Sequence, residues 1–350
     1  MKRMRNVLVL LGIGVLVWGL YSWQQTDDES KPVQRTFTPV QFVERATLVD
    51  SLYKPGLVYV WGGDVYVADY GDRMLKRFSL DGTFKNTIGK GLGQGPGEFM
   101  TFVGFVVDSS GVWVVDINSR RLTQFAHDGT YLQSSVLSFA PYRITKRDSL
   151  VVVSNASFPM EGHHVYVFTP SGQVLYTFGD EMYEYVEDPM VLSAELFTTP
   201  AGYALLATYG SYLFEYGADR GALLRTLRLV DQREFPKGRR AKNEAGETVM
   251  KAPRTSLVYV DGFATPEYWY VHTRMHAGKV KGRPVELSVI DRYKYATGEY
   301  VDSFKLPIRK ANGVFITDNT LVALGDTTVH IYDIKMGEQL AAITNEQIRQ

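Results

Sequence analysis

Histidine offers the most recognisable site chemistry in this chain, which contains six histidines and no cysteine. His272 and His276 are four residues apart, so they share one face of a strand if the strand continues that far. Imidazole nitrogens are good zinc ligands, and His163, beside His164, is the candidate third ligand. We therefore consider His163, His272 and His276 as a possible metal site. The alternative interpretation is solvated histidines in loops and at strand ends.

Tyrosine, phenylalanine and arginine form a second group of candidates, because these side chains favour binding hot spots. The expected ligand or partner surface consists of Tyr142, Arg143, Tyr209, Tyr212, Arg239 and Arg240, with Phe158 and Phe214 nearby in the sequence. The two arginines belong to the basic stretch 237–242, which is flanked by Glu234, Glu244 and Glu247. The alternatives are ordinary packing for the aromatic residues and a solvated segment for the basic ones.

Several activities lack the residues or the context that they require. The glycine-rich run 89–97, GKGLGQGPG, has no Lys-Ser/Thr opening a helix, so we interpret it as a turn and not as a phosphate-binding loop. No nucleophile-elbow sequence is present, and we assign no catalytic residue. The 38 basic residues balance 38 acidic ones, which gives no electrostatic footprint for nucleic acid.

The elements that must position these candidates follow a repeat. Asp69, Leu75, Phe78, Gly82 and their neighbours recur at Asp116, Leu122, Phe125 and Gly129, a shift of 47 residues (116 minus 69). Units of about 40 to 50 residues, with short alternating strands and a glycine turn, are typical of β-propellers. We expect each turn glycine to have φ > 0, and each repeated Asp to cap a turn and pair with the repeated Arg73 or Arg120.

An aromatic residue followed by a turn glycine marks each unit. The pairs are Phe78/Gly82, Phe125/Gly129, Phe168/Gly172, Tyr216/Gly221, Tyr293/Gly298 and Tyr332/Gly337. The wide gap between the fourth and fifth pairs would fit two blades, but 231–254 is charged and lacks alternation, which favours an insertion loop. The prediction is therefore an all-β, six-bladed β-propeller over 40–350, with seven blades as the alternative. Segment 40–50 is expected to close the ring as a strand of the last blade.

The N-terminal segment resembles a membrane signal anchor. Basic residues precede an apolar run over 7–20, and aromatic residues follow it, namely Lys2, Arg3, Arg5, Trp18, Tyr21 and Trp23. As a helix, residues 6–23 would span about 27 Å. We expect a single-pass anchor over 1–23 and an exposed linker over 24–39, with the propeller outside the bacterial inner membrane. A cleaved signal peptide and a cytosolic protein are the alternatives.

Blades one and two resemble the NHL repeat. The resemblance rests on GLGQGPGEF (91–99), Gly104, Asp108, GVWVVD (111–116), Arg120, Phe125 and Asp128-Gly129, and Phe102 departs from it where the pattern has proline. It implies a six-bladed propeller of the kind found in bacterial exported proteins. Some relatives of that kind are lyases that bind zinc through histidines. Lactonase-like propellers hold a divalent cation through Glu, Asn and Asp, for which Glu98, Asn118, Asn155 and Asp261 are the possible donors here.

The sequence therefore predicts an exported, membrane-anchored propeller that binds a protein, a small molecule or a glycan on its rim. We expect no cofactor and no nucleic-acid partner. The alternative function is a metal-dependent hydrolase or lyase with zinc or calcium in the central channel.

Overall fold

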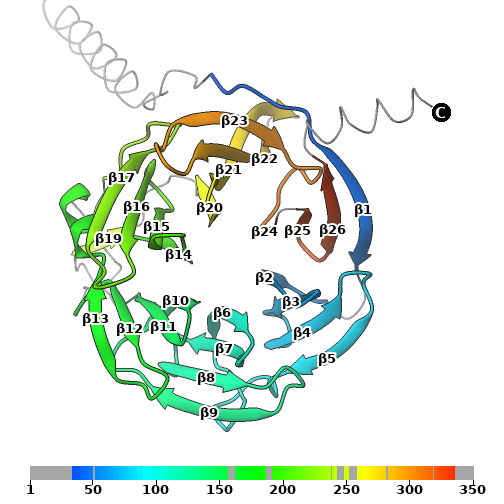
Figure 1. Cartoon of the computed structure of the whole chain (residues 1–350), viewed down its shortest axis with the longest axis vertical. Helices are drawn as coiled ribbons and strands as arrows, with labels where there is room; N and C mark the ends of the chain where they lie inside the picture. Colours follow the sequence, from blue (N-terminus) through cyan, green and yellow to red (C-terminus); the bar gives the residue numbers. More distant parts are fainter. Residues whose placement is uncertain are drawn as a thin grey trace, which may run out of the picture. The chain divides into compact units, whose positions relative to one another are not determined.

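The computed structural model describes residues 34–49, 52–156, 162–186, 191–237, 239–242, 248–251, 258–280, 283–317 and 319–335. Residues Arg35–Gln350 form one compact unit. In it, six four-stranded antiparallel sheets stand around a central channel (Figure 1). This arrangement is a six-bladed β-propeller, as the sequence predicts.

In blades one to five the first strand lies at the channel and the fourth at the periphery (Figure 1). Blade one comprises β2 (Pro55–Trp61), β3 (Asp64–Asp69), β4 (Met74–Ser79) and β5 (Phe84–Ile88); blade two comprises β6 (Phe102–Asp108), β7 (Gly111–Asp116), β8 (Arg121–Phe125) and β9 (Tyr131–Val136); blade three comprises β10 (Pro141–Arg147), β11 (Leu150–Asn155), β12 (Val165–Phe168) and β13 (Val174–Phe178).

The second half of the chain continues this order. A short 3-10 helix η1 (Asp180–Tyr185) precedes blade four. Blade four comprises β14 (Ala194–Thr198), β15 (Gly202–Ala207), β16 (Tyr212–Gly217) and β17 (Leu223–Arg228); blade five comprises β20 (Tyr259–Ala264), β21 (Tyr268–Val280), β22 (Arg283–Lys294) and β23 (Tyr300–Lys305); blade six comprises β24 (Gly313–Ile316), β25 (Thr320–Leu324), β26 (Val329–Lys335) and, outermost, β1 (Gln41–Leu48).

The core lies between the blades, because both faces of each sheet are covered by its neighbours. Side chains of a strand alternate between the faces, and in β3 every residue is buried. Val65 and Val67 pack toward blade six, whereas Tyr66 and Ala68 pack toward blade two. The alternation in the sequence therefore does not separate a buried face from a solvated one. It divides apolar side chains between two neighbouring blades.

Strand β1 lies against β26, although the two come from opposite ends of the chain (Figure 1). Gln41 lies opposite Lys335 and Leu48 opposite Val329. The ring is thus closed by backbone hydrogen bonds within one blade. The segment before β1 also belongs to the compact unit. Phe37 bridges Ser303 of β23, and the Arg35 side chain, only 4% exposed, pairs with Asp291.

Within the expected linker 24–39, hydrogen bonds and an ion pair that the local sequence does not reveal hold residues 35–38 against blade five. Thr36 and Phe37 are exposed, as expected of a linker, whereas Arg35 and Thr38 are partly buried. Residues 1–33 lie outside the described part of the chain, and with them the predicted anchor and the rest of the linker. Among the residues that are described, no helix is both long and apolar enough to cross a membrane.

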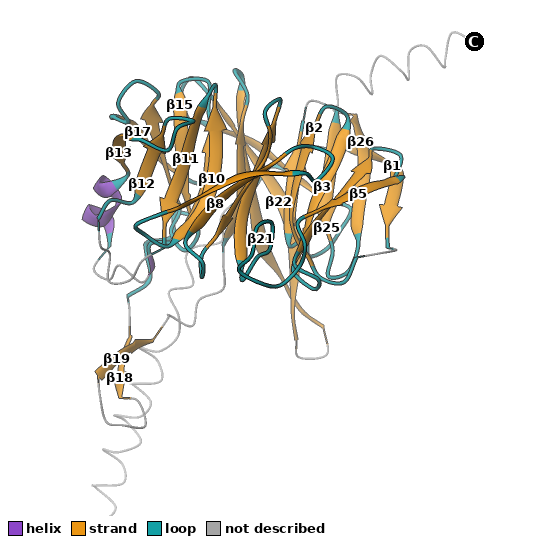
Figure 2. Ribbon diagram, turned by 90° about the horizontal axis from the view of Figure 1, so that it is seen from below, coloured by secondary structure: helices purple, strands orange, loops and turns teal. Residues whose placement is uncertain are grey.

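The insertion between β17 and β20 also differs from the expected loop. It contains a two-stranded sheet of β18 (Arg239–Lys242) and β19 (Thr248–Lys251), visible apart from the blades in Figure 2. The sequence of β18 is RRAK and that of β19 is TVMK, and neither alternates between apolar and polar residues in the way that a half-buried strand does. Blade five follows this insertion; its first strand begins at Tyr259, and its central strands β21 and β22 are the longest of the propeller.

The repeated aspartates cap turns, as expected, but their predicted partner is wrong. Asp69 accepts hydrogen bonds from the backbone N–H groups of Tyr53, Lys54 and Gly71. Its cationic partner is Lys76 at 2.7 Å, not Arg73. Arg73 lies in the turn with φ 58° and donates instead to the carbonyl of Met100 in the next blade. The capping aspartates therefore tie each incoming loop to the second strand of its blade.

Candidate ligand site in the central channel

The central channel contains two adjoining cavities. One has a volume of about 290 Å³ and is lined by the innermost strands of all six blades. The other, about 260 Å³, lies toward the beginnings of these strands and includes Tyr142, Tyr259 and Asn312. Six residues line both cavities and thus form the layer between them, namely Leu57, Val58, Arg143, Glu195, Asp261 and Val314.

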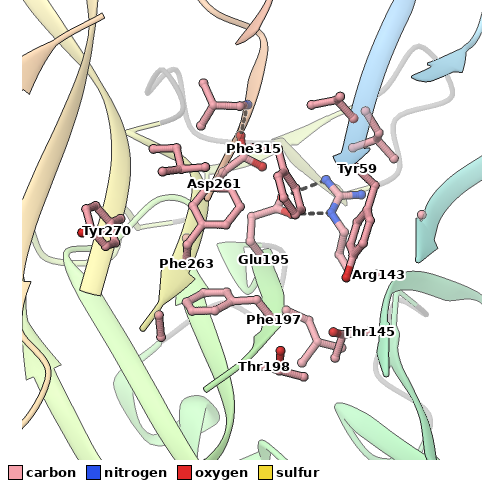
Figure 3. A pocket seen from close by; sticks show the side chains of 18 of the residues that line it. Tyr59, Arg143, Thr145, Glu195, Phe197, Thr198, Asp261, Phe263, Tyr270 and Phe315 are labelled. Atoms are coloured by element: carbon pink, nitrogen blue, oxygen red, sulfur yellow. Dashed lines mark hydrogen bonds and ion pairs between the residues drawn. The ribbon is translucent and has the colours of Figure 1, made fainter. Parts of the chain in front are cut away.

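An ion pair crosses this shared layer from blade three to blade four. Arg143 of β10 donates from Nε and Nη2 to the two carboxylate oxygens of Glu195 in β14, at 2.5 and 2.8 Å (Figure 3). Its Nη1 donates to the carbonyl of Val103, and the guanidinium lies 4.0 Å from the ring centre of Tyr142. A bidentate pair with this many contacts holds both side chains in one orientation.

Burial and pairing act in opposite directions on the two charges. Burial raises the pKa of Glu195, and the neighbouring Arg143 only partly offsets this rise. Burial alone would lower the pKa of Arg143, but Glu195 outweighs that effect and the pKa lies above its ordinary value. The side chains keep 19% and 15% of their surface accessible from the channel. We conclude that Arg143 stays charged and that Glu195 is its fixed partner.

Asp261 supplies the third charge of the layer, from β20 in blade five. Its Oδ2 accepts a hydrogen bond of 2.8 Å from the backbone N–H of Val314 (Figure 3). The Nδ1 atom of His272, in the neighbouring strand β21, lies 3.5 Å from the same oxygen. Among the described residues, no lysine or arginine forms an ion pair with Asp261. The layer thus holds two carboxylates and one guanidinium, and that guanidinium is already paired with Glu195.

Aromatic rings form much of the wall of the larger cavity. Phe105, Tyr59, Phe315 and Phe263 follow one another across blades two, one, six and five. Their successive ring centres are 6.2, 4.8 and 5.6 Å apart. Phe197 adds a ring from blade four (Figure 3). Thr145 and Thr198 supply hydroxyl groups. An apolar wall with a few convergent polar groups is the usual composition of a small-molecule site.

The sheet register explains why the three charged residues meet. Leu57 lies opposite Ala68 and Gly104 opposite Val115, each one residue before a capping aspartate. The three charged members of the shared layer occupy the corresponding place in blades three, four and five, as shown by the pairing of Arg143 with Ser154, Glu195 with Leu206 and Asp261 with His272. Equivalent positions of the repeat stand at one level of the channel, so three consecutive blades place charges side by side.

The structure does not bring together the histidines considered as a metal site. His163 precedes β12 in blade three and lies 2.5 Å from Asp180. His272 and His276 both belong to β21 of blade five, where His272 is fully buried and His276 is exposed. In the described part of the chain, no three His, Asp or Glu side chains are placed to hold a metal ion. Both ring nitrogens of His272 lack a hydrogen-bond partner there.

The four donors suggested by lactonase-like propellers do not converge either. Glu98 accepts from the backbone of Gly95 in the glycine-rich turn, and Asn118 donates to Thr101. Asn155 ends β11 and donates to the carbonyl of His163. Only Asp261 faces the channel.

The expected rim surface is divided among three places. Tyr142 and Arg143 are in β10 and line the channel. Tyr209 follows β15 and is half-buried; burial and the nearby Tyr142 raise its pKa. Tyr212 in β16 stacks on Phe235 at 5.3 Å and donates to Glu234. Arg239 and Arg240 are in β18, and their side chains lie outside the described part, as does Phe158.

Sequence reasoning missed Glu195 and the aromatic wall. The repeat does contain a signal for Glu195. When the inner strands are aligned by their capping positions, Glu195 stands where blades one and two have Leu57 and Gly104, so a charge replaces an uncharged residue. The aromatic residues carry no such signal. Tyr59, Phe197 and Phe315 occupy ordinary strand positions, and only the closed ring brings them together.

Comparison with known proteins agrees with the fold. A sequence family described as "6-bladed beta-propeller" matches residues 24–177, which cover less than half of the chain. None of the curated proteins matches the sequence. The protein is a six-bladed β-propeller, which is the class that both the matched family and the structure define. The more specific resemblance to NHL repeats stays a prediction.

Solved structures resemble this fold at low sequence identity. A predicted exported protein of Bacteroides fragilis is 13% identical, with 89% of this chain and 98% of that chain covered and a TM-score of 0.51. A duf4221 family member from Bacteroides vulgatus is 13% identical, with 86% and 99% covered and a TM-score of 0.54. The WD40 domain of Neurospora crassa Pan2 is 7% identical, with 83% and 95% covered and a TM-score of 0.53. At such identities the likeness concerns the fold alone.

Proposed function

We propose that this protein is an extracytoplasmic binding protein that takes a small organic ligand into its central channel. The observation that carries the proposal is the larger cavity, which all six innermost strands line with aromatic rings around one charged layer. Its volume of about 290 Å³ is near the lower end of ordinary ligand pockets. The proposed site lies inside the channel, deeper than the rim expected from the sequence.

A ligand screen with a filled channel tests this proposal. The full-length protein, in detergent, is screened by saturation-transfer NMR against a library of small fragments. Thr198→Trp places an indole in the cavity, and Thr297→Trp, in an exposed turn, is the control. We expect fragments to bind the wild type and Thr297→Trp but not Thr198→Trp. Equal binding to Thr198→Trp by every hit would contradict a channel site.

We propose that the site functions without a resident metal ion, because the candidate ligands do not converge among the described residues. The melting temperature and fragment binding should then be unchanged after dialysis against EDTA. A lower melting temperature that recovers with zinc or calcium would favour the hydrolase or lyase alternative instead.

We further propose that residues 1–23 anchor the propeller to the bacterial inner membrane. The support is the basic, apolar and aromatic order of the sequence, together with the structural likeness to an exported protein. The full chain should sediment with membranes and resist carbonate extraction, and a chain without residues 1–23 should not. Recovery of the full chain in the soluble fraction would contradict the anchor.

A further inference from the structure

We infer that the channel ligand is an organic cation, an ammonium group on an apolar body, with Asp261 as its counterion. This inference rests on the proposed channel site and names the chemical class of its ligand. It follows from the charges in the shared layer, the hydrogen bonds of Asp261 and the aromatic rings beside it.

The charge of the layer is the first argument. Arg143 and Glu195 satisfy each other through two hydrogen bonds. Among the described residues, Asp261 accepts a hydrogen bond from one neutral backbone N–H and stands 3.5 Å from a histidine ring. The Asp261 side chain is partly withdrawn from solvent, and a carboxylate in such a place is stabilised by a cation or by several donors. A ligand ammonium group at Asp261 would supply that compensation.

The geometry around Asp261 is the second argument. Hydrogen bonding to Val314 occupies Oδ2 and holds the carboxylate toward blade six. Among the described residues, Oδ1 accepts no hydrogen bond from the protein, although 22% of the side chain is accessible. Asp261, Phe263 and Phe315 all line the larger cavity (Figure 3). One oxygen is thus fixed and the other is available to a donor.

The aromatic wall is the third argument, because the faces of aromatic rings attract cations. Phe315 is flanked by Tyr59 at 4.8 Å and Phe263 at 5.6 Å. The two phenylalanines carry no polar group that would prefer an anion. An anionic ligand would instead need Arg143, three of whose five N–H groups already donate to protein acceptors and whose charge is paired with Glu195.

Three compounds of nearly equal shape test the charge of the ligand. They are 2-phenylethylamine, 2-phenylethanol and phenylacetate, titrated calorimetrically into the full-length protein at pH 7. We expect the amine to bind about ten- to a hundredfold more tightly than the alcohol, since a hydrogen bond to a charged group is worth about 1.5–3 kcal/mol. Phenylacetate should bind most weakly. Equal binding of amine and alcohol, tighter binding of phenylacetate, or no binding of the amine would overturn the inference.

Asp261→Asn tests the residue itself. Asparagine keeps an acceptor for the Val314 N–H group but removes the charge, so the preference for the amine over the alcohol should disappear. Asp219→Asn, on an exposed turn, is the matched control and should keep the preference. An unchanged preference in Asp261→Asn would overturn the assignment. If Asp261→Asn does not fold, the three-compound comparison on the wild type still decides the charge of the ligand.

The same titrations separate this inference from the proposed function. If amine and alcohol bind equally and Thr198→Trp abolishes both, the channel site stands and the cation inference is wrong. If Thr198→Trp binds the compounds as the wild type does, the channel site is wrong as well.

Discussion

At the scale of single residues, Arg35 shows how strongly one buried charge can join distant parts of the chain. Its guanidinium donates to Asp231 at 2.8 Å and to both oxygens of Asp291 at 2.9 Å. Asp291 is fully buried and also accepts from Ser303. Burial raises the pKa of Asp291, and Arg35 opposes that rise. Removing Arg35 would therefore leave two carboxylates without their common cation.

We expect Arg35→Met to destabilise the protein by about 3–5 kcal/mol, the usual cost of breaking one side of a buried ion pair. The free energy of unfolding is measured by urea denaturation. Arg45→Met is the control, because Arg45 and Asp333 are each more than a third exposed and such pairs contribute about 0–1 kcal/mol. Similar losses in the two variants would show that Arg35 acts as an ordinary surface charge.

His164 predicts a dependence of stability on pH. It is 3% exposed, and burial lowers its pKa to about 4, although Asp180 acts in the opposite direction. The unfolded chain has a histidine pKa of about 6.5. Between these values only the unfolded state binds the proton, so stability falls as the pH decreases from about 6.5 to about 4.

His164→Gln should remove this contribution. The free energy of unfolding of the wild type should decrease between pH 6.5 and 4.5 more steeply than that of the variant, by at most about 1.4 kcal/mol per pH unit. Urea titrations at several pH values measure the difference. Parallel pH profiles would mean that His164 titrates alike in the folded and unfolded states.

At the scale of structural elements, the turn glycines of blades one and two lie against the outer strand of the preceding blade. Gly82, Gly129 and Gly172 have φ angles of 92°, 92° and 84°, as predicted for these hairpins. A methyl group at Gly129 would lie 2.5 Å from the Thr87 carbonyl oxygen at the end of the preceding blade's outer strand. At Gly82 the nearest atoms belong to Ala46 and Leu48 of β1. The outer strand β1 of blade six thus contacts the turn of blade one, as the outer strand β5 of blade one contacts the turn of blade two.

These glycines form a matched series for alanine substitution. All three variants incur similar strain at positive φ, but the space around the added methyl differs. At Gly172 the atom nearest to the added methyl group would be Ser135 Oγ, at 4.0 Å. We expect Gly172→Ala to cost about 1–2 kcal/mol from strain alone and Gly129→Ala to cost more, with Gly82→Ala between them. Urea denaturation gives the order, and an equal cost for all three would show that the contacts between blades do not matter.

At the scale of the whole molecule, the sequence reveals the fold better than the site. The repeat from Asp69 to Gly82 is local, so the blades and the turn glycines can be predicted from neighbouring residues. The partners of Arg35, Asp231 and Asp291, are 196 and 256 positions away, and the charged layer needs strands from three blades at one level. Arg143 and Asp261 could be noted as polar residues in the sequence, but only the closed ring shows that they face the same channel.

The central claim, that the channel is the ligand site, is tested most directly by NMR of isoleucine methyl groups during titration of the full-length protein. Ile316 is partly buried and Ile144 is buried between blades two and three, but both line the larger cavity. Ile88 and Ile331 are buried between blades away from that cavity. We predict that 2-phenylethylamine shifts the methyl signals of Ile144 and Ile316 in a saturable manner and leaves those of Ile88 and Ile331 in place. Binding of 2-phenylethylamine without any change at Ile144 and Ile316 would contradict the account.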